Sequence, residues 1–120
     1  MSVFVSYAMG DKLRIRKIID ELKSRGIVSP SEKILQNSDI VIPGPNVREQ
    51  VRKAIAEASK VVVVWSDAGA ESDWVNYETG MAEALGKPIW VIVSKGKIEQ
   101  VPKTFEYNQI IELEESSARR

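Results

Sequence analysis

A run of seven residues, 72–78, holds the side chains with the clearest capacity for chemistry in this chain. It reads Ser-Asp-Trp-Val-Asn-Tyr-Glu and ends in Glu78. Ser72 is a good N-cap, so the run predicts the start of a helix. The Gly-Lys-Pro sequence at 86–88 predicts the end of that helix after Leu85. The chemistry open to Glu78 depends on which face of this helix it occupies.

On a helical wheel Glu78 falls on the apolar side. Trp74, Met81 and Leu85 lie within roughly 20° of one another, and Glu78 lies about 40° from Trp74. The opposite, solvated face is predicted to hold Asn76, Thr79 and Glu83. A carboxylate on a core-facing stripe is costly unless it is paired or lines a site. Three interpretations stay open: a helix-edge carboxylate that reaches water, a partner for a buried Arg or Lys, and a site carboxylate.

Composition narrows the chemistry further. The 120 residues contain no Cys and no His, which excludes disulfides, thiolate nucleophiles, Cys/His zinc sites and Ser-His-Asp arrangements. An enzyme of this composition must use a carboxylate, Lys or Tyr as its titrating group. Lys plus Arg equals Asp plus Glu, 17 each, so no strong field indicates a nucleic-acid or membrane partner. The longest apolar run, 61–65, is far too short to span a membrane, and we expect a cytoplasmic protein.

The order of apolar segments predicts an α/β fold. Buried strands are expected at 3–5, 61–66 and 89–93, a last strand at 109–113, and helices at 12–25, from 47 after an Asn46 cap, and at 72–85. The second strand is ambiguous, because both Ile27–Val28 and Asp39–Ile42 have suitable residues. We therefore expect a flavodoxin-like, open and mostly parallel five-stranded sheet with helices on both faces. Residues 1–113 would form this domain, and residues 114–120 a polar tail.

This topology gives Glu78 a place near a ligand site. In open α/β sheets ligands bind beyond the carboxyl ends of the strands. Residues 6–9 and Ser66 leave two strands at that edge, and the helix that holds Glu78 begins there. The placement favours a site carboxylate. No Gly-rich phosphate loop follows a strand and no acidic cluster has metal-loop spacing, so a dinucleotide fold, triphosphate hydrolysis and a metal site are not expected.

Four pieces of the sequence, in order, resemble TIR (Toll/interleukin-1 receptor) domains of the NAD-cleaving type. Phe4-Val5-Ser6-Tyr7 is similar to their opening strand, and Ile42-Pro43-Gly44 to their BB loop. Val61 to Ser66 is similar to the third strand. Ser72-x-Trp74-x-x-x-Glu78 matches the motif that holds the catalytic glutamate of enzymatic members. The resemblance covers residues 3 to about 113, and residues 27–39 are its least alignable part.

The resemblance implies an NAD+ glycohydrolase, or an ADP-ribosyl cyclase, acting in bacterial antiphage defence signalling. NAD+ would be the substrate, with no cofactor and no metal. Glu78 would be the catalytic residue, with a substrate-binding wall formed by Ser6, Tyr7, Ala8, Met9 and Trp74. The BB loop would gate the site or mediate assembly through Ile42, Pro43, Gly44, Pro45 and Asn46. Homo-oligomers or filaments and a fused or separate sensor or effector module are the implied partners.

Two other functions stay open. A non-catalytic TIR interaction module would assemble through loop and helix surfaces, but it leaves the position of Glu78 unexplained. An enzyme related to nucleoside deoxyribosyltransferases would also use a glutamate on a glycosidic bond, but it gives no reason for the spacing of Trp74 and Glu78. Detection of nicotinamide release would separate these hypotheses.

Overall fold

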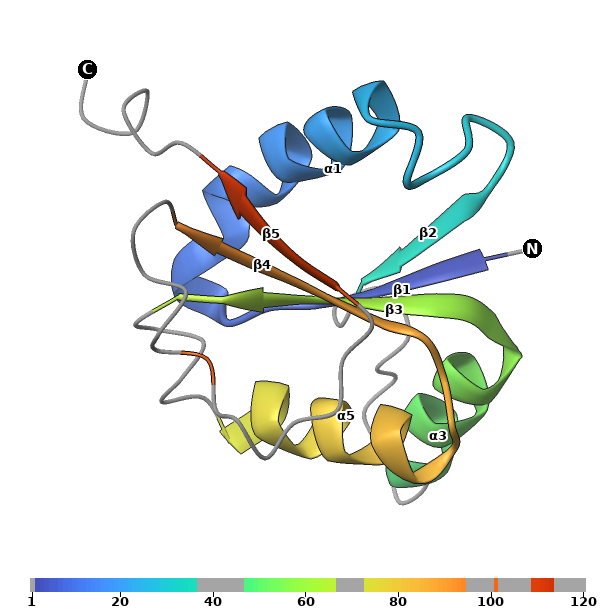
Figure 1. Ribbon diagram of the computed structural model, residues 1–120. Helices are drawn as coiled ribbons and strands as arrows, with labels where there is room; N and C mark the ends of the chain where they lie inside the picture. The colour runs from blue at the N-terminus through green and yellow to red at the C-terminus, as the bar shows by residue number, and fades with distance from the viewer. Residues whose placement is uncertain (1, 37–46, 67–72, 95–100, 102–108, 114–120) are drawn as a thin grey trace.

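The computed structural model describes residues 2–36, 47–66, 73–94, 101 and 109–113 (Figure 1). Its elements in chain order are β1 (Ser2–Ser6), the 3₁₀ helix η1 (Met9–Arg14), α1 (Ile15–Ser24), β2 (Lys33–Gln36), α3 (Val47–Glu57), β3 (Ala58–Trp65), α5 (Asp73–Ala84), β4 (Ile89–Ser94) and β5 (Gln109–Leu113). None of the helices in these ranges is long and apolar enough to cross a membrane.

The five strands form one sheet in the order β2-β1-β3-β4-β5, and every neighbouring pair is parallel. This arrangement confirms the predicted flavodoxin-like α/β fold. Helix α1 covers one face of the sheet, and α3 and α5 cover the other (Figure 1). The chain moves outward from β1 to β2 and then returns to the other side of β1 with β3. The carboxyl ends of β1 and β3 therefore form the switch point where open sheets of this kind bind ligands.

Alternation along the central strands divides the core into two layers. Successive side chains point to opposite faces of a strand, and side chains two residues apart share a face. On β1, Phe4 belongs to the layer under α3 and α5, whereas Val3 and Val5 belong to the layer under α1. On β3, Val61, Val63 and Trp65 take the α3/α5 side, and Val62 and Val64 take the α1 side. All of these side chains are buried, as expected for parallel strands covered on both faces.

The predicted helix ends after α1 and α5 are confirmed. Gly26 and Gly86 have φ values of +78° and +68°, a backbone conformation that residues with a Cβ rarely adopt. After α5, the Gly86 N–H donates to Glu83 O and the Lys87 N–H to Ala82 O, both at 3.0 Å. These bonds satisfy carbonyl groups that the end of the helix would otherwise leave unpaired.

Three boundaries differ from the sequence prediction. The second strand is Lys33–Gln36, whereas Ile27 and Val28 form the turn after α1, where their N–H groups donate to Leu22 O at 3.0 and 3.4 Å. This edge strand is only half-buried and pairs with β1 alone, so its residues show no clear hydrophobic period. β3 begins at Ala58, ahead of the expected start at 61, and residues 12–14 of the expected 12–25 helix belong to η1. Residues 39–42 lie outside the described part of the chain.

Candidate functional site

Glu78 lies in the second turn of α5, about 7.5 Å along the helix axis from Asp73. Its side chain is fully buried, with 0% exposure. Among the α5 side chains that the structure describes, those of Val75, Glu78, Thr79 and Ala82 are buried. Glu78 therefore belongs to the core-facing side of the helix.

The buried stripe is rotated about a quarter turn from the predicted one. Thr79 was expected on the solvated face, but it is fully buried, and its hydroxyl donates to Val75 O at 2.8 Å. That bond within the helix satisfies the threonine hydroxyl, so a polar residue fits the core-facing side. Met81, predicted to lie at the centre, is only partly buried. Glu78 lies within both the predicted and the observed stripe, and it is fully buried.

Ser6 holds the buried carboxyl group of Glu78. Its hydroxyl donates to Glu78 Oε1 at 2.5 Å, and Ser6 is itself fully buried. Ser6 follows Phe4 by two positions and is the last residue of β1, so it faces α5 at the carboxyl end of that strand. This contact joins residues 72 positions apart at the sheet's switch point.

The second carboxyl oxygen of Glu78 has a different environment. No donor or acceptor in the described residues reaches Glu78 Oε2, although this atom is buried. In the part of the chain that the structure describes, Glu78 neither reaches water nor pairs with an Arg or Lys, and the site carboxylate is the interpretation that fits these observations. A buried polar atom without a partner is uncommon in folded proteins and calls for an explanation, such as a catalytic role or an absent ligand.

Burial raises the pKa of Glu78 from 4.5 to about 8, and the Ser6 hydroxyl bond opposes this rise in part. The cause is the loss of hydration, which penalises the charged form. Stabilisation by a helix N-terminus falls off within the first turn, and Glu78 lies beyond it. Glu78 is therefore mostly a neutral acid at pH 7 in this structure. A strongly perturbed carboxyl group at a ligand-binding edge is a functional-site candidate.

The structure places the other predicted site residues on two faces of the sheet. Ala8 is buried in the same layer as Phe4, on the α5 side. Tyr7 lies in the layer under α1, where its hydroxyl donates to Gln36 Oε1 at 3.2 Å. The structure thus brings Ser6 and Ala8, but not Tyr7, to the face that Glu78 occupies.

Several predicted site residues lie beyond this description. Met9 is in η1 and Trp74 is in the first turn of α5, but their side chains are outside the described part. The loop residues Ile42, Pro43, Gly44, Pro45 and Asn46 are also outside it.

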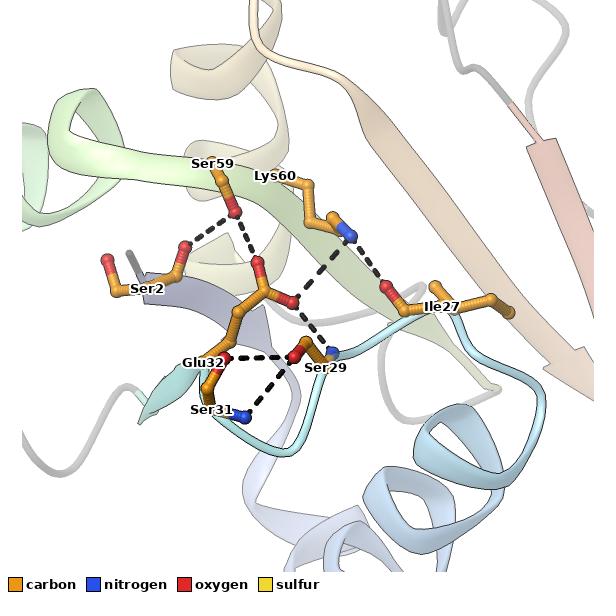
Figure 2. A network of polar contacts seen from close by, with 7 residues as sticks. All are labelled: Ser2, Ile27, Ser29, Ser31, Glu32, Ser59 and Lys60. Atoms are coloured by element: carbon orange, nitrogen blue, oxygen red, sulfur yellow. Dashed lines mark hydrogen bonds and ion pairs between the residues drawn. The ribbon is translucent and has the colours of Figure 1, made fainter.

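A second polar cluster, which the sequence did not predict, occupies the amino ends of the strands (Figure 2). Glu32 accepts hydrogen bonds from the Ser29 N–H at 2.8 Å and from Ser59 Oγ at 2.9 Å, and Lys60 Nζ lies 3.9 Å from it. Ser59 Oγ also lies 3.0 Å from Ser2 O. The Ser29 N–H bond is the main cause of a lowered Glu32 pKa, with Ser59 and Lys60 acting in the same direction. The cluster holds the turn after α1 against β1 and β3.

A shallow depression of about 460 Å³ lies beside this cluster. It is lined by Arg25, Gly26, Ile27, Lys60, Trp90 and Ile111. These residues come from the end of α1 and from the face of the sheet that α1 covers. The depression therefore does not adjoin Glu78, which lies on the other face.

The fold is an open parallel sheet with a buried acid, Glu78, at its switch point. The family profile described as TIR domain matches residues 3–119. The chain belongs to the TIR domain family, which confirms the resemblance seen in the sequence.

Individual relatives agree with this assignment. The chain is 31% identical over 77 residues to a probable 2′ cyclic ADP-D-ribose synthase from Methanobrevibacter olleyae, a match that covers 63% of this chain and 21% of that protein. The TIR domain of the Toll-related receptor TRR-2 from Hydra magnipapillata has a TM-score of 0.64 at 21% identity, covering 89% of this chain and 82% of that one. A CMP N-glycosidase from Clostridium botulinum has a TM-score of 0.59 at 18% identity, covering 95% and 91%. The two structural likenesses support the fold alone.

Proposed function

We propose that this chain cleaves NAD+ at the nicotinamide–ribose bond and that Glu78 is its catalytic carboxylate. The observation that supports this most is the state of Glu78 in the fold. It is a fully buried acid at the sheet's switch point, with one oxygen bonded to Ser6 and the other without a partner in the described residues. Such an acid costs stability, and a substrate that needs a carboxylate gives a reason for its presence.

The reaction suits a single carboxylate. The bond between ribose C1′ and the nicotinamide nitrogen breaks, and its electron pair leaves with nicotinamide, which departs as a neutral molecule. Because the leaving group is already cationic in the substrate, no general acid is needed. Positive charge develops on the ribosyl group in an oxocarbenium-like transition state, and a nearby carboxylate stabilises it. Water, or a group of the same substrate molecule, then attacks C1′ and loses a proton.

The raised pKa of Glu78 fits a site that is completed by its substrate. A positive charge within about 4–6 Å favours the ionised form of a carboxyl group. The nicotinamide ring of NAD+ carries such a charge, so its binding would lower the pKa of Glu78 and generate the carboxylate where it is needed. Ionised Oε2 would then accept a hydrogen bond from a ribose hydroxyl.

The similarity to a probable 2′ cyclic ADP-D-ribose synthase supports NAD+ as substrate and leaves both products, ADP-ribose and a cyclic form, within the proposal. The match spans about a fifth of that protein. The proposed activity therefore rests mainly on the residues of this chain, above all Glu78. Assembly into homo-oligomers and a role in antiphage defence are proposed from the family resemblance.

The test is to incubate the purified chain with NAD+ over a range of protein concentrations and follow nicotinamide release. Glu78→Gln keeps the size of the side chain and should lower release by at least about 100-fold. Glu83→Gln, a substitution on the same helix away from the buried stripe, is the matched control and should retain activity. Chromatography of the ribosyl product separates hydrolase from cyclase. Release that rises faster than protein concentration would support assembly.

A nucleotide N-glycosidase is the second candidate, because the same buried carboxylate could act on another N-glycosidic bond. CMP and deoxynucleosides are therefore included as substrates. Base release from these compounds without nicotinamide release would replace the NAD+ proposal. Equal nicotinamide release by the wild type and by Glu78→Gln would remove Glu78 from the mechanism. If a folded wild type released no base from any of them at any concentration, the interaction module would be the better account.

A further inference from the structure

The two oxygens of the Glu78 carboxyl group are not equivalent. Oε1 accepts a hydrogen bond from the Ser6 hydroxyl, with 2.5 Å between the two oxygens, whereas Oε2 has no hydrogen-bond partner among the described residues. Both residues are fully buried, so this difference is not averaged by solvent.

We propose that Ser6 is a positioning residue, which fixes Oε1 and thereby directs Oε2 to the substrate. The inference rests on the proposed function and assigns Ser6 a role through Glu78, not through the wall of the substrate site. Ser6 is held in place because β1 pairs with strands on both sides, with Val5 opposite Gln36 and Val62, and Ser6 opposite Val63. A serine side chain has one rotatable bond to its hydroxyl, so the fixed backbone sets the position of the donor closely.

Ser6 also has an electrostatic effect on Glu78. A hydroxyl that donates to a carboxylate stabilises the ionised form, and Ser6 opposes the rise that burial causes in the Glu78 pKa. Loss of this bond leaves desolvation unopposed. Apolar side chains that share the buried layer with α5 include Phe4, Val51, Ile55, Val61, Val63 and Trp65.

The described charged side chains on β3 and α3, two elements that pack against α5, do not face Glu78. Lys60 is bound at the amino end of β3, where its Nζ donates to Ile27 O. On α3, the charged side chains exposed to solvent are Arg48, Glu49, Arg52, Lys53 and Glu57. Among the described residues, Ser6 is therefore the donor that can tune Glu78.

The test compares Ser6→Ala, Ser6→Thr and Thr79→Val. Ser6→Ala removes the donor, Ser6→Thr keeps a hydroxyl on a strand-favouring residue, and Thr79→Val removes a buried hydroxyl one residue away from Glu78. The first readout is the titration of the Glu78 side-chain carboxyl carbon by NMR in the substrate-free chain. The second is kcat and KM for nicotinamide release as functions of pH.

In Ser6→Ala the Glu78 titration should move up by about one pH unit, the scale of a hydrogen bond to a charged group. The acid limb of kcat/KM, which we expect near pH 8 in the wild type, should move with it. At pH 7 kcat/KM should therefore fall about tenfold, because the ionised fraction of Glu78 in the substrate-free chain falls by that factor. Ser6→Thr should restore both values, and Thr79→Val should leave both where the wild type has them.

A merely structural role for Ser6 would lower the melting temperature and leave the Glu78 titration in place, which would overturn the inference. A shift of the same size in Thr79→Val would overturn it as well. The NMR titration decides the matter even if the wild type releases no nicotinamide. In that case the proposed function fails, while an unchanged titration in Ser6→Ala would separately show that Ser6 does not tune Glu78.

Discussion

Replacement of Glu78 by Gln should make the protein more stable, and the gain should grow with pH. Glu78 is fully buried and its pKa is about 8 in the folded chain, against 4.5 in the unfolded one. Between these values the folded state keeps a proton that the unfolded state has released. The wild type therefore loses stability as the pH rises from about 4.5 to about 8, and the Gln variant, which cannot titrate, is spared this loss.

The size of the effect follows from the two pKa values. A difference of one bound proton changes the free energy of unfolding by about 1.4 kcal/mol per pH unit. Both pH 5 and pH 7 fall inside the interval from 4.5 to about 8. The stability difference between variant and wild type should therefore increase by about 2.5 kcal/mol between pH 5 and pH 7. That is a large fraction of the 5–15 kcal/mol typical of a domain.

Urea unfolding followed by far-ultraviolet circular dichroism at pH 5, 6, 7 and 8 measures this difference. Glu57→Gln, which removes an exposed carboxyl group from α3, is the control for the loss of one acidic side chain. If the Glu78→Gln and wild-type curves stayed parallel across this range, Glu78 would have to titrate alike in both states. The buried neutral acid, and the account of the site built on it, would then be wrong.

Two further predictions concern the scaffold. Gly80→Ala should stabilise the chain by about 1 kcal/mol and Gly86→Ala should destabilise it by about 1 kcal/mol. An added Cβ meets nothing within 4 Å at either position, and of the two only Gly86 has a positive φ. Comparison of the two variants therefore measures the effect of backbone conformation without a steric clash. Glu32→Gln should lower stability by about 1.5–2 kcal/mol near neutral pH, because the carboxylate accepts two hydrogen bonds in a partly buried cluster. The Glu32 pKa is lowered in the folded chain, so this loss should shrink as the pH falls below 4.5.

Urea midpoints of these variants beside the wild type provide the measurement. Equal effects of Ala at positions 80 and 86 would contradict the assigned backbone conformations. For Glu32, a stability loss that persists undiminished at pH 3.5 would point to packing in place of charge. Nicotinamide release should be unchanged in Glu32→Gln, since the cluster lies at the other end of the strands from Glu78.

The sequence predicts the topology well where strands are buried on both faces. The runs at 61–65 and 89–93 are apolar without alternation, and only a central parallel strand suits them. The edge strand Lys33–Gln36 could not be found in this way, because half of its surface faces solvent and no period results. Its position depends on pairing with β1, a contact between distant residues that local pattern does not encode.

The candidate site, like the fold, could be predicted from the sequence only in part. The wheel places Glu78 on the apolar side of its helix, and the structure confirms this. The wheel misplaces Thr79, because a threonine that bonds to the carbonyl of Val75 within its own helix is compatible with the core. The Ser6–Glu78 bond depends on how α5 lies across β1, a packing angle with no local signature. The alternation from Phe4 to Ser6 was the available signal that Ser6 faces the helix.

The position of β1 inside the sheet has a consequence for the order in which this chain acquires its site. β1 is the first strand in the sequence, yet its neighbours on the two sides are β2 and β3, and Ser6 meets a partner 72 residues further along. Contacts of such sequence separation form late, because a long loop must close before they contribute. A nascent or truncated chain that ends before α5 has β1 but no Glu78 for Ser6 to hold. The Ser6–Glu78 contact is thus a product of completed folding, and partly synthesised chains lack it.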